Sequence, residues 1–478
     1  MKSRRLLFRL SCSGTVLASA LLTACNSRDA RAGQALNNYE TAMTSGNLLA
    51  ARDALVAAVK ARDDVAEYWE DLGEIQLQLG SLSDANYAFT RAQELDRDNP
   101  RVLAALSQLS LAGGNLELAQ RYERELELVA PQDPSVKLVS GYLLLTRHQL
   151  DDAGKEVDSL LQTAPFDPGA KLLKARILVA KGNRDGAIAL LEQQASEKPN
   201  DAASLKALLI LLRRNDEWPK IASAAARLAA LQPSNQNAAL TAIRAAFKAN
   251  DIALAKTLSE ARLVPGTPPD EVNSVLLLWA RYWRDPAAVR EALVLARSAS
   301  PQQRLAYASY FNSVGQAKPA AALAGGGPKL PVTMANSSSN AIYAEALAVD
   351  GHLAEAKRLL DTILAEEPDH VYALRARTRL ELRTGGAGAA VQDAQRLVTI
   401  EPDSPDDRLL LAQAHEANGD PRSATRSLWD AFHDIPGNED LYQALRGKLQ
   451  ASGGADAARQ VDDEYGQQRD LQMEREFI

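Results

Sequence analysis

The stretch WEDLGEIQLQLG, Trp69 to Gly80, combines a large aromatic residue, a Leu-Gly pair and a closing glycine in an otherwise helical pattern. Glycine destabilises a helix interior, so Gly73 needs a reason. A residue without a side chain lets a second helix pack closely at that point. Gly80 can adopt the left-handed backbone conformation that ends a helix. The stretch therefore predicts a helix that packs closely on a neighbour and ends at Gly80.

The same pattern recurs along the chain with a period of 34 residues. Glycines mark the predicted helix ends at Gly46, Gly80, Gly114, Gly182, Gly351, Gly385, Gly419 and Gly453. Alanines follow five residues later, at Ala51, Ala85, Ala119, Ala187, Ala356, Ala390, Ala424 and Ala458. His148 and Asn250 replace the glycine in two further units, which keep the alanine at Ala153 and Ala255. A fixed period of this length is typical of stacked helical or mixed units.

The unit from Ala66 to Asn99 resembles the tetratricopeptide repeat, a helix-turn-helix motif with this period. It departs from the family pattern at Arg97, where the family usually has proline, and matches it at Trp69, Leu72, Gly73, Gly80, Ala85, Phe89 and Ala92. The resemblance implies a concave groove lined by the first helix of each unit. The predicted fold is an all-α, right-handed superhelical solenoid of about thirteen such units.

The repeat phase divides the chain into segments. We expect a signal peptide at residues 1–24, a lipid-anchored linker at 25–31, a first array at 32–269, degenerate repeats with a Gly/Pro/Ser-rich loop at 270–336, a second array at 337–472 and a tail at 473–478. The pattern is weakest between Pro265 and Asn336, so a domain boundary is expected there. The loop from Gly325 to Asn340 is either a hinge or a surface connection between two units.

The chain begins like a bacterial signal peptide. Four basic residues among the first nine precede an apolar segment, Leu10–Leu22, that is too short to span a membrane as a helix. The following LTAC, Leu22–Cys25, resembles the lipobox, which implies cleavage before Cys25 and its attachment to fatty acids such as palmitate. A plain secretory signal is the alternative. Asn26 is not the aspartate that retains lipoproteins at the inner membrane, so the resemblance favours the periplasmic face of the outer membrane.

The cysteine count and the net charge bear on disulfide formation and on nucleic-acid binding. Cys12 lies in the segment that would be removed, so Cys25 would remain alone and no internal disulfide could form. Loss of the four basic residues of that segment takes the formal charge from −7 to −11. We therefore expect no nucleic-acid partner.

The sequence carries no motif for catalysis, a cofactor or a metal. No two of its five histidines are four residues apart, as a helical zinc pair requires. It contains neither a phosphate-binding G-x-x-x-x-G-K-[ST] motif nor a G-x-S-x-G nucleophile motif. We predict that the protein is not an enzyme and has no cofactor.

Charged residues on predicted first helices are candidates for partner binding. Asp63–Glu74 carries six carboxylates and no basic residue, although acidic residues also stabilise a helix N-terminus. A basic group falls on groove-facing positions of successive units, with a solvated face as the alternative. It comprises Arg176, Lys206, Arg213, Arg244 and Lys248.

A third group lies on the predicted helix Val371–Arg383. Arginines recur there every four residues, where like charges disfavour a helix by about 0.2–0.5 kcal/mol per pair. Arg377 is expected to pair with Glu381, four residues on. The stripe is predicted to bind carboxylates, which guanidinium groups hold in a bidentate manner; carboxylates from neighbouring helices are the alternative. It comprises Tyr372, Arg375, Arg379 and Arg383.

Together these features predict a membrane-anchored periplasmic scaffold for protein–protein interactions in a cell-envelope assembly, such as polysaccharide export, a pilus or secretion. Its expected partners are envelope proteins and, through the lipid on Cys25, the membrane. The alternative is direct binding of an anionic polymer, such as an anionic polysaccharide, or a peptide tail in the basic groove.

Overall fold

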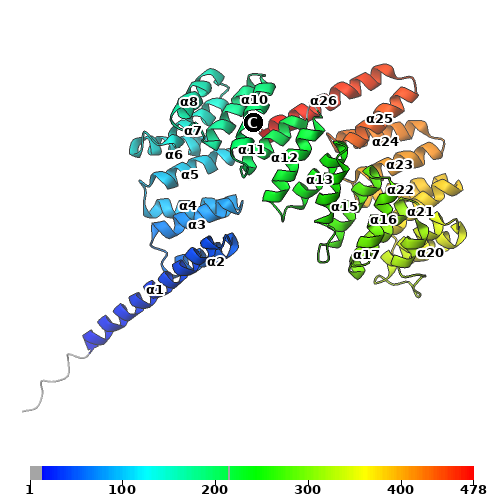
Figure 1. The fold of residues 1–478 in the computed structure, drawn as a ribbon, viewed down its shortest axis with the longest axis horizontal. Coiled ribbons are helices and arrows are strands. Elements are labelled where there is room, and N and C mark those ends of the chain that lie inside the picture. The colour runs from blue at the N-terminus through cyan, green and yellow to red at the C-terminus, as the bar shows by residue number, and fades with distance from the viewer. Residues whose placement is uncertain (1–12, 214–215, 478) are drawn as a thin grey trace, which may run out of the picture. The chain divides into compact units, whose positions relative to one another are not determined.

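The computed structural model describes residues 13–213 and 216–477, and the side chains of residues 28–213 and 216–473. In these ranges the chain is α-helical without strands, and its 26 helices follow one another as thirteen pairs (Figure 1). The predicted all-α repeat fold is confirmed. The helices are α1 (Ser13–Thr44), α2 (Leu48–Ala61), α3 (Ala66–Gln78), α4 (Leu82–Leu95), α5 (Pro100–Ala112), α6 (Leu116–Val129), α7 (Pro134–Thr146), α8 (Leu150–Thr163), α9 (Pro168–Ala180), α10 (Arg184–Glu197), α11 (Ala202–Leu212), α12 (Trp218–Leu231), α13 (Gln236–Lys248), α14 (Ile252–Glu260), α15 (Pro269–Tyr282), α16 (Pro286–Leu295), α17 (Pro301–Ser313), α18 (Ala317–Leu323), α19 (Ser337–Val349), α20 (Leu353–Glu366), α21 (Val371–Thr384), α22 (Ala387–Ile400), α23 (Pro405–Ala417), α24 (Pro421–Asp434), α25 (Glu439–Ala451) and α26 (Ala455–Phe477).

The left-handed turns between paired helices follow from the sequence. Gly80 has a φ angle of +78°, and the glycines at the corresponding positions of other units also have positive φ angles. His148 and Asn250 adopt the same conformation, with φ of 56° and 58°. A side chain is uncommon there, because only glycine enters this region without steric cost. The period thus imposes the turn even where the glycine is missing.

Close packing between helices explains why glycine and alanine recur at fixed positions of the repeat. Gly73 lies against Phe89 of α4, and a Cβ atom at Gly73 would stand only 2.8 Å from the phenyl ring. Ala85 is fully buried, and the alanines at the equivalent positions of the other units are at most 3% exposed. Phe89 and Leu72 belong to the same core cluster, so bulk from one helix fills the space that small residues leave on its neighbour.

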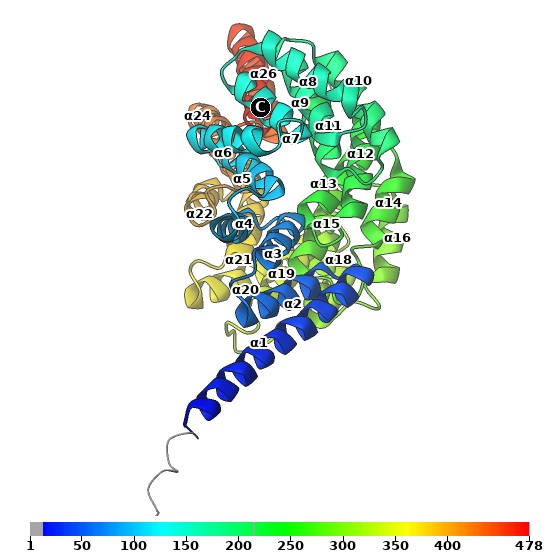
Figure 2. The ribbon, with the colours of Figure 1, turned by 90° about the vertical axis from the view of Figure 1, so that its left-hand side faces the viewer.

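The helices form two compact units, Met1–Leu190 and Leu191–Ile478, called unit 1 and unit 2 below. Their division falls inside α10, whereas the sequence predicts a boundary between Pro265 and Asn336. In that stretch of unit 2 the helices continue as α15 to α18 (Figure 2). Aromatic packing accompanies the weaker repeat pattern there, as in the pair Trp279–Trp283, whose ring centroids lie 4.7 Å apart.

Hydrogen bonds tie the loop before α19 to the array. The buried Asn340 side chain accepts from the Lys329 backbone N–H at 2.8 Å and donates to the Lys329 carbonyl at 2.9 Å. Val332 also packs against the core of the following units. These contacts hold the loop against α19 and the units that follow it.

At the N-terminal end, α1 runs through residues 13–31, where the sequence predicts part of a signal peptide and a linker. Residues 1–12 and the side chain of Cys25 lie outside the described residues, so lipidation stays a prediction. Among the described helices, none has the length and apolar character needed to cross a membrane.

At the C-terminal end, α26 packs on α25 and also contacts α11 (Figure 1). Val461 is buried against α25, and Tyr465 stacks on Tyr442 with ring centroids 4.0 Å apart. The last helix therefore covers the end of the array and also joins it to the first helices of unit 2.

Candidate functional site

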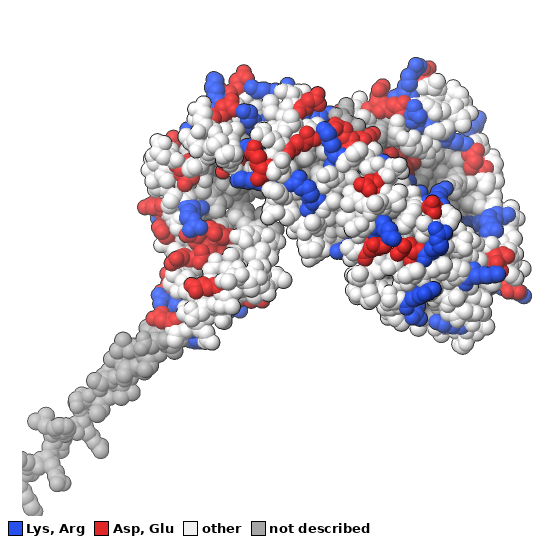
Figure 3. All heavy atoms as spheres, in the orientation of Figure 1, with Lys and Arg blue, Asp and Glu red and all other residues white. Residues whose placement is uncertain are grey.

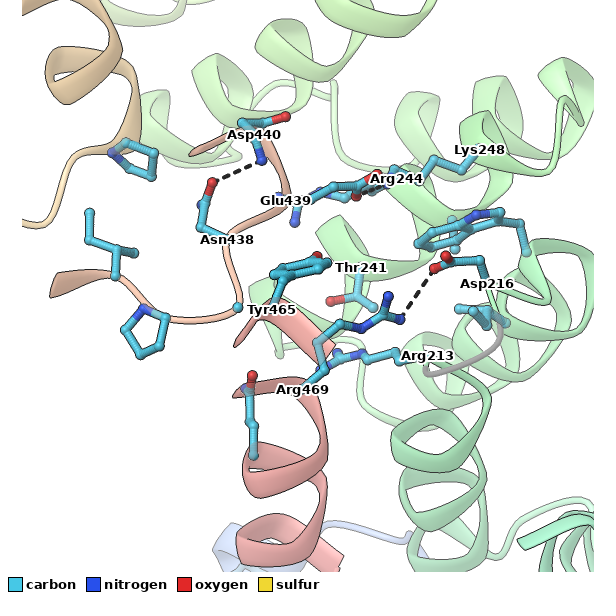
Figure 4. Close-up of a pocket in the computed structure, with 18 of the residues that line it drawn as sticks. Arg213, Asp216, Thr241, Arg244, Lys248, Asn438, Glu439, Asp440, Tyr465 and Arg469 are labelled. Carbon is cyan, nitrogen blue, oxygen red and sulfur yellow. Dashed lines mark hydrogen bonds and ion pairs between the residues drawn. The ribbon is translucent and has the colours of Figure 1, made fainter. Parts of the chain in front are cut away.

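Unit 2 holds a cavity of about 530 Å³, within the range of about 300–1,000 Å³ typical of ligand pockets. One wall comes from α11, α12, α13 and α15, and the other from the starts of α23 and α25 together with α26 (Figure 4). Three members of the predicted basic group, Arg213, Arg244 and Lys248, meet here. Four acidic residues and two further arginines join them: Asp216, Asp406, Glu439, Asp440, Arg281 and Arg469.

Three ion pairs cross the cavity from one wall to the other. In the pair between Lys248 and Glu439, the lysine also lies over the Trp218 ring, with Nζ 4.2 Å from the ring centroid. Such partly exposed pairs each contribute about 0–1 kcal/mol, but together they fix how the two walls face each other. They are Lys248–Glu439, Arg281–Asp440 and Arg469–Asp216, the last with 3.3 Å between Nη2 and Oδ1.

Two arginines of the cavity have no ion pair or hydrogen bond with any described residue. Arg213 caps the C-terminus of α11, Arg244 lies within α13, and both are exposed. Of the acidic residues in the lining, only Asp406 stands outside the three pairs, and its charge acts on Arg281. The cavity therefore keeps unneutralised positive charge at Arg213 and Arg244.

The arginines of α21 are placed differently. Arg375 holds Asp407 of α23 in a bidentate pair, with Nε–Oδ1 at 2.7 Å and Nη2–Oδ2 at 2.6 Å, and it also pairs with Glu401. Burial lowers the pKa of Arg375, but the hydrogen bonds and charges of Asp407 and Glu401 outweigh it, so the pKa lies above its usual value. Arg375 is thus committed within the fold.

Neighbouring units also supply partners to the rest of the predicted stripe. Arg379 Nη1 lies 2.8 Å from Glu345 Oε1 on α19, and Arg383 Nη1 donates to the Ala348 carbonyl at 2.9 Å. Tyr372 remains 40% exposed. This geometry is the alternative in which neighbouring helices supply the acceptors, and a partner-binding role for the stripe stays a prediction.

The expected pairing of Arg377 is wrong. Its guanidinium binds Asp393 of α22 in a bidentate manner, at 2.7 and 2.8 Å, and Asp361 of α20 at 2.9 Å. Glu381 instead pairs with Lys357 of α20. Contacts between helices here outcompete the weak interaction available four residues along one helix.

Family profiles identify the repeat. One described as "Tetratricopeptide repeat" matches residues 40–100 and 344–406, and one described as "Psidin, N-terminal TPR repeats region" matches residues 137–258. The chain belongs to the tetratricopeptide repeat (TPR) proteins. TPR proteins mediate protein–protein interactions, and their repeats are typically non-enzymatic.

Solved structures that resemble the chain are distant. A TPR protein from Parabacteroides merdae shows 16% identity and a TM-score of 0.33, covering 55% of this chain and 98% of that one. PilF of Pseudomonas aeruginosa shows 17% identity and a TM-score of 0.31, and the match covers 49% of this chain and 98% of PilF. PilW, a type IV pilus biogenesis factor, shows 14% identity and a TM-score of 0.30, and the match covers 48% of this chain and 90% of PilW. No curated protein matches the chain.

The remaining two basic candidates are not in the lining of the cavity of this TPR array. Lys206 is exposed on α11 but does not line the cavity. Arg176 belongs to unit 1, where its guanidinium lies 5.4 Å from the centroid of the Tyr142 ring. Of the five predicted basic residues, three line the cavity.

Several cavity residues were not anticipated from the sequence. Tyr465 and Arg469 reach the cavity because α26 contacts α11, and no local sequence pattern predicts this contact. Arg281, on α15, reaches its partner Asp440 on α25, which is distant in sequence. Glu439 and Asp440 could be noticed only as acidic residues in the first turn of α25, a common arrangement at a helix start.

The predicted acidic group lies on and just before α3 of unit 1, and Figure 3 shows acidic side chains gathered in this part of the surface. Arg101 of α5 pairs with Glu70, at 2.9 Å, and with Glu74. Burial and the charges of Glu67, Glu74 and Glu70 raise the pKa of Asp71 to about 6. Among the described side chains, no group of three His, Cys, Asp or Glu residues is placed to hold a metal ion.

Proposed function

We propose that the chain is a lipid-anchored periplasmic scaffold that holds proteins of a cell-envelope assembly together, in polysaccharide export, a pilus or secretion. The observation that carries the anchoring is LTAC, Leu22–Cys25, directly after an apolar segment. The interaction role rests on the TPR repeats, which present exposed faces of their first helices along the array.

The two cysteines allow a matched test of anchoring. Cells that express the full chain are fed an alkyne-tagged fatty acid, and incorporation is measured for Cys25→Ser and for the control Cys12→Ser. Label should be lost only with Cys25→Ser. Label that persists without Cys25 would contradict the lipoprotein proposal. In the same cells, Asn26→Asp should move the protein from the outer to the inner membrane fraction.

A second experiment tests the scaffold role. A photo-crosslinking residue is placed at Leu277, exposed on the first helix α15, or at Leu293, exposed on the second helix α16. The first helices face the proposed groove, so Leu277 should give discrete crosslinks to envelope proteins in living cells and Leu293 should give few. Equal crosslinking at both positions would argue against partner binding through the first helices.

Direct binding of an anionic polymer or peptide tail is the second candidate function. The observation that favours it is the pair of arginines without partners in the unit 2 cavity, Arg213 and Arg244.

A further inference from the structure

The distribution of ion pairs singles out two guanidinium groups in the unit 2 cavity. Lys248, Arg281 and Arg469 each have a carboxylate from the opposite wall. Arg213 and Arg244 have none among the described residues, and both remain exposed. The array therefore neutralises the charges that join its walls and leaves two other positive charges in the lining of the cavity.

A structural role does not account for both arginines. Arg213 gains from its place at the C-terminus of α11, where a positive charge stabilises the helix. Arg244 has no such benefit, because it lies inside α13 with Lys248 four residues on, a spacing that disfavours like charges. Thr241, on the turn before Arg244, adds a hydroxyl group to the same wall (Figure 4).

We propose that Arg213 and Arg244 bind carboxylates of an acidic segment from a protein partner. The proposal rests on the scaffold function above. Guanidinium groups bind carboxylates through paired, charge-assisted hydrogen bonds. Two half-buried apolar side chains in the same lining, Ile210 and Ile435, suit a segment that carries both acidic and apolar residues.

The aromatic residues of the cavity favour a peptide over an acidic polysaccharide. A sugar ring that binds by stacking needs an open aromatic face. Here cations lie near the rings: Lys248 at Trp218, 4.2 Å from the centroid, Arg281 at Tyr282, 5.6 Å, and Arg469 at Tyr465, 5.5 Å.

The test uses the purified full chain and fluorescein-labelled hexaglutamate, with binding measured by anisotropy at low salt. Replacing both Arg213 and Arg244 by Gln should weaken binding at least about tenfold while the melting temperature stays unchanged. The matched control replaces Arg290 and Arg297 by Gln, because both are exposed and neither lines the cavity. This control should bind like the parent chain.

Further arms separate the sources of the carboxylate. Amidation of the hexaglutamate C-terminus weakens binding if the terminal carboxylate is held, and leaves it unchanged if the side chains are held. The proposal is overturned if hexaglutamate does not bind, if the double variant binds equally well, or if oligogalacturonate binds and hexaglutamate does not. Lipidation at Cys25 and crosslinking at Leu277 do not depend on these arginines, so the scaffold function can stand when this site fails.

Discussion

α21 and α3 are both first helices of a repeat, and both carry runs of like charge, but the structure treats them in opposite ways. Each arginine of α21 finds an acceptor on a neighbouring unit, as Arg375 does with Asp407. On α3, Glu70 and Glu74 share one arginine, Arg101, and the carboxyl group of Asp71 lies among like charges. A charge run therefore shows only that a face is charged, because its neutralisation depends on the next helices.

The two helices also differ in what holds them. Asp407 is 1% exposed, so its pair with Arg375 is a requirement of the fold. On α3 the close contact between Gly73 and Phe89 provides the attachment, while the acidic face remains a source of repulsion. Substitutions at Arg375, Gly73 and Asp71 separate the contributions of paired charge, close packing and crowded charge to stability.

The largest expected effect comes from Arg375→Gln. It leaves the buried carboxylate of Asp407 without its bidentate partner, and loss of one member of a buried pair costs about 3 kcal/mol or more. Urea unfolding followed by circular dichroism should show this loss. A variant as stable as the parent chain would show that the pairing on α21 does not support the fold.

The next effect concerns packing on α3. Gly73→Ala forces a methyl group against the Phe89 ring, which is itself buried, and should cost about 2 kcal/mol. Gly447→Ala is the control, since a Cβ there meets nothing within 4 Å; it should stabilise α25 by up to about 1 kcal/mol. Equal midpoints for the two variants would mean that α3 is not held by this contact.

Crowded charge on α3 should produce a smaller, pH-dependent effect. The folded-state pKa of Asp71, about 6, lies above the ordinary value of 3.8, so the folded state binds the proton more tightly and stability falls as pH rises between these values. Because Asp71 is only half-buried, screening limits the loss to about 1 kcal/mol. Asp71→Asn should therefore stabilise the protein by about this amount near neutral pH and hardly at all near pH ~4. The same gain at both pH values would exclude titration of Asp71 as the cause.

Arg379→Gln should have the smallest effect. Arg379 is 55% exposed in its pair with Glu345, and exposed pairs contribute about 0.5 kcal/mol. Its melting temperature should stay within about 1 °C of the parent value. A loss as large as that from Arg375→Gln would mean that exposure does not separate the two arginines.

Much of the fold follows from local rules that the sequence displays. The position of His148 in the period was enough to predict a turn, and the structure gives it the left-handed conformation that glycine has in other units. The partners of α21 were harder to predict, although Glu345 and Arg379 are one period of 34 residues apart. The cavity could not be predicted, because Lys248 and Glu439 are 191 residues apart and meet only where α25 and α26 approach the first helices of unit 2.

We propose that arginines on first helices serve two roles: those of α21 stabilise the fold, and Arg213 and Arg244 bind a ligand. One thermal melt, with and without hexaglutamate, tests both roles in two double variants. Replacing Arg375 and Arg379 by Gln should lower the melting temperature of the free protein and keep the increase caused by the peptide. Replacing Arg213 and Arg244 by Gln should keep the melting temperature of the free protein and abolish that increase. The reverse outcome, with stability lost at the cavity and binding lost at α21, would contradict the account.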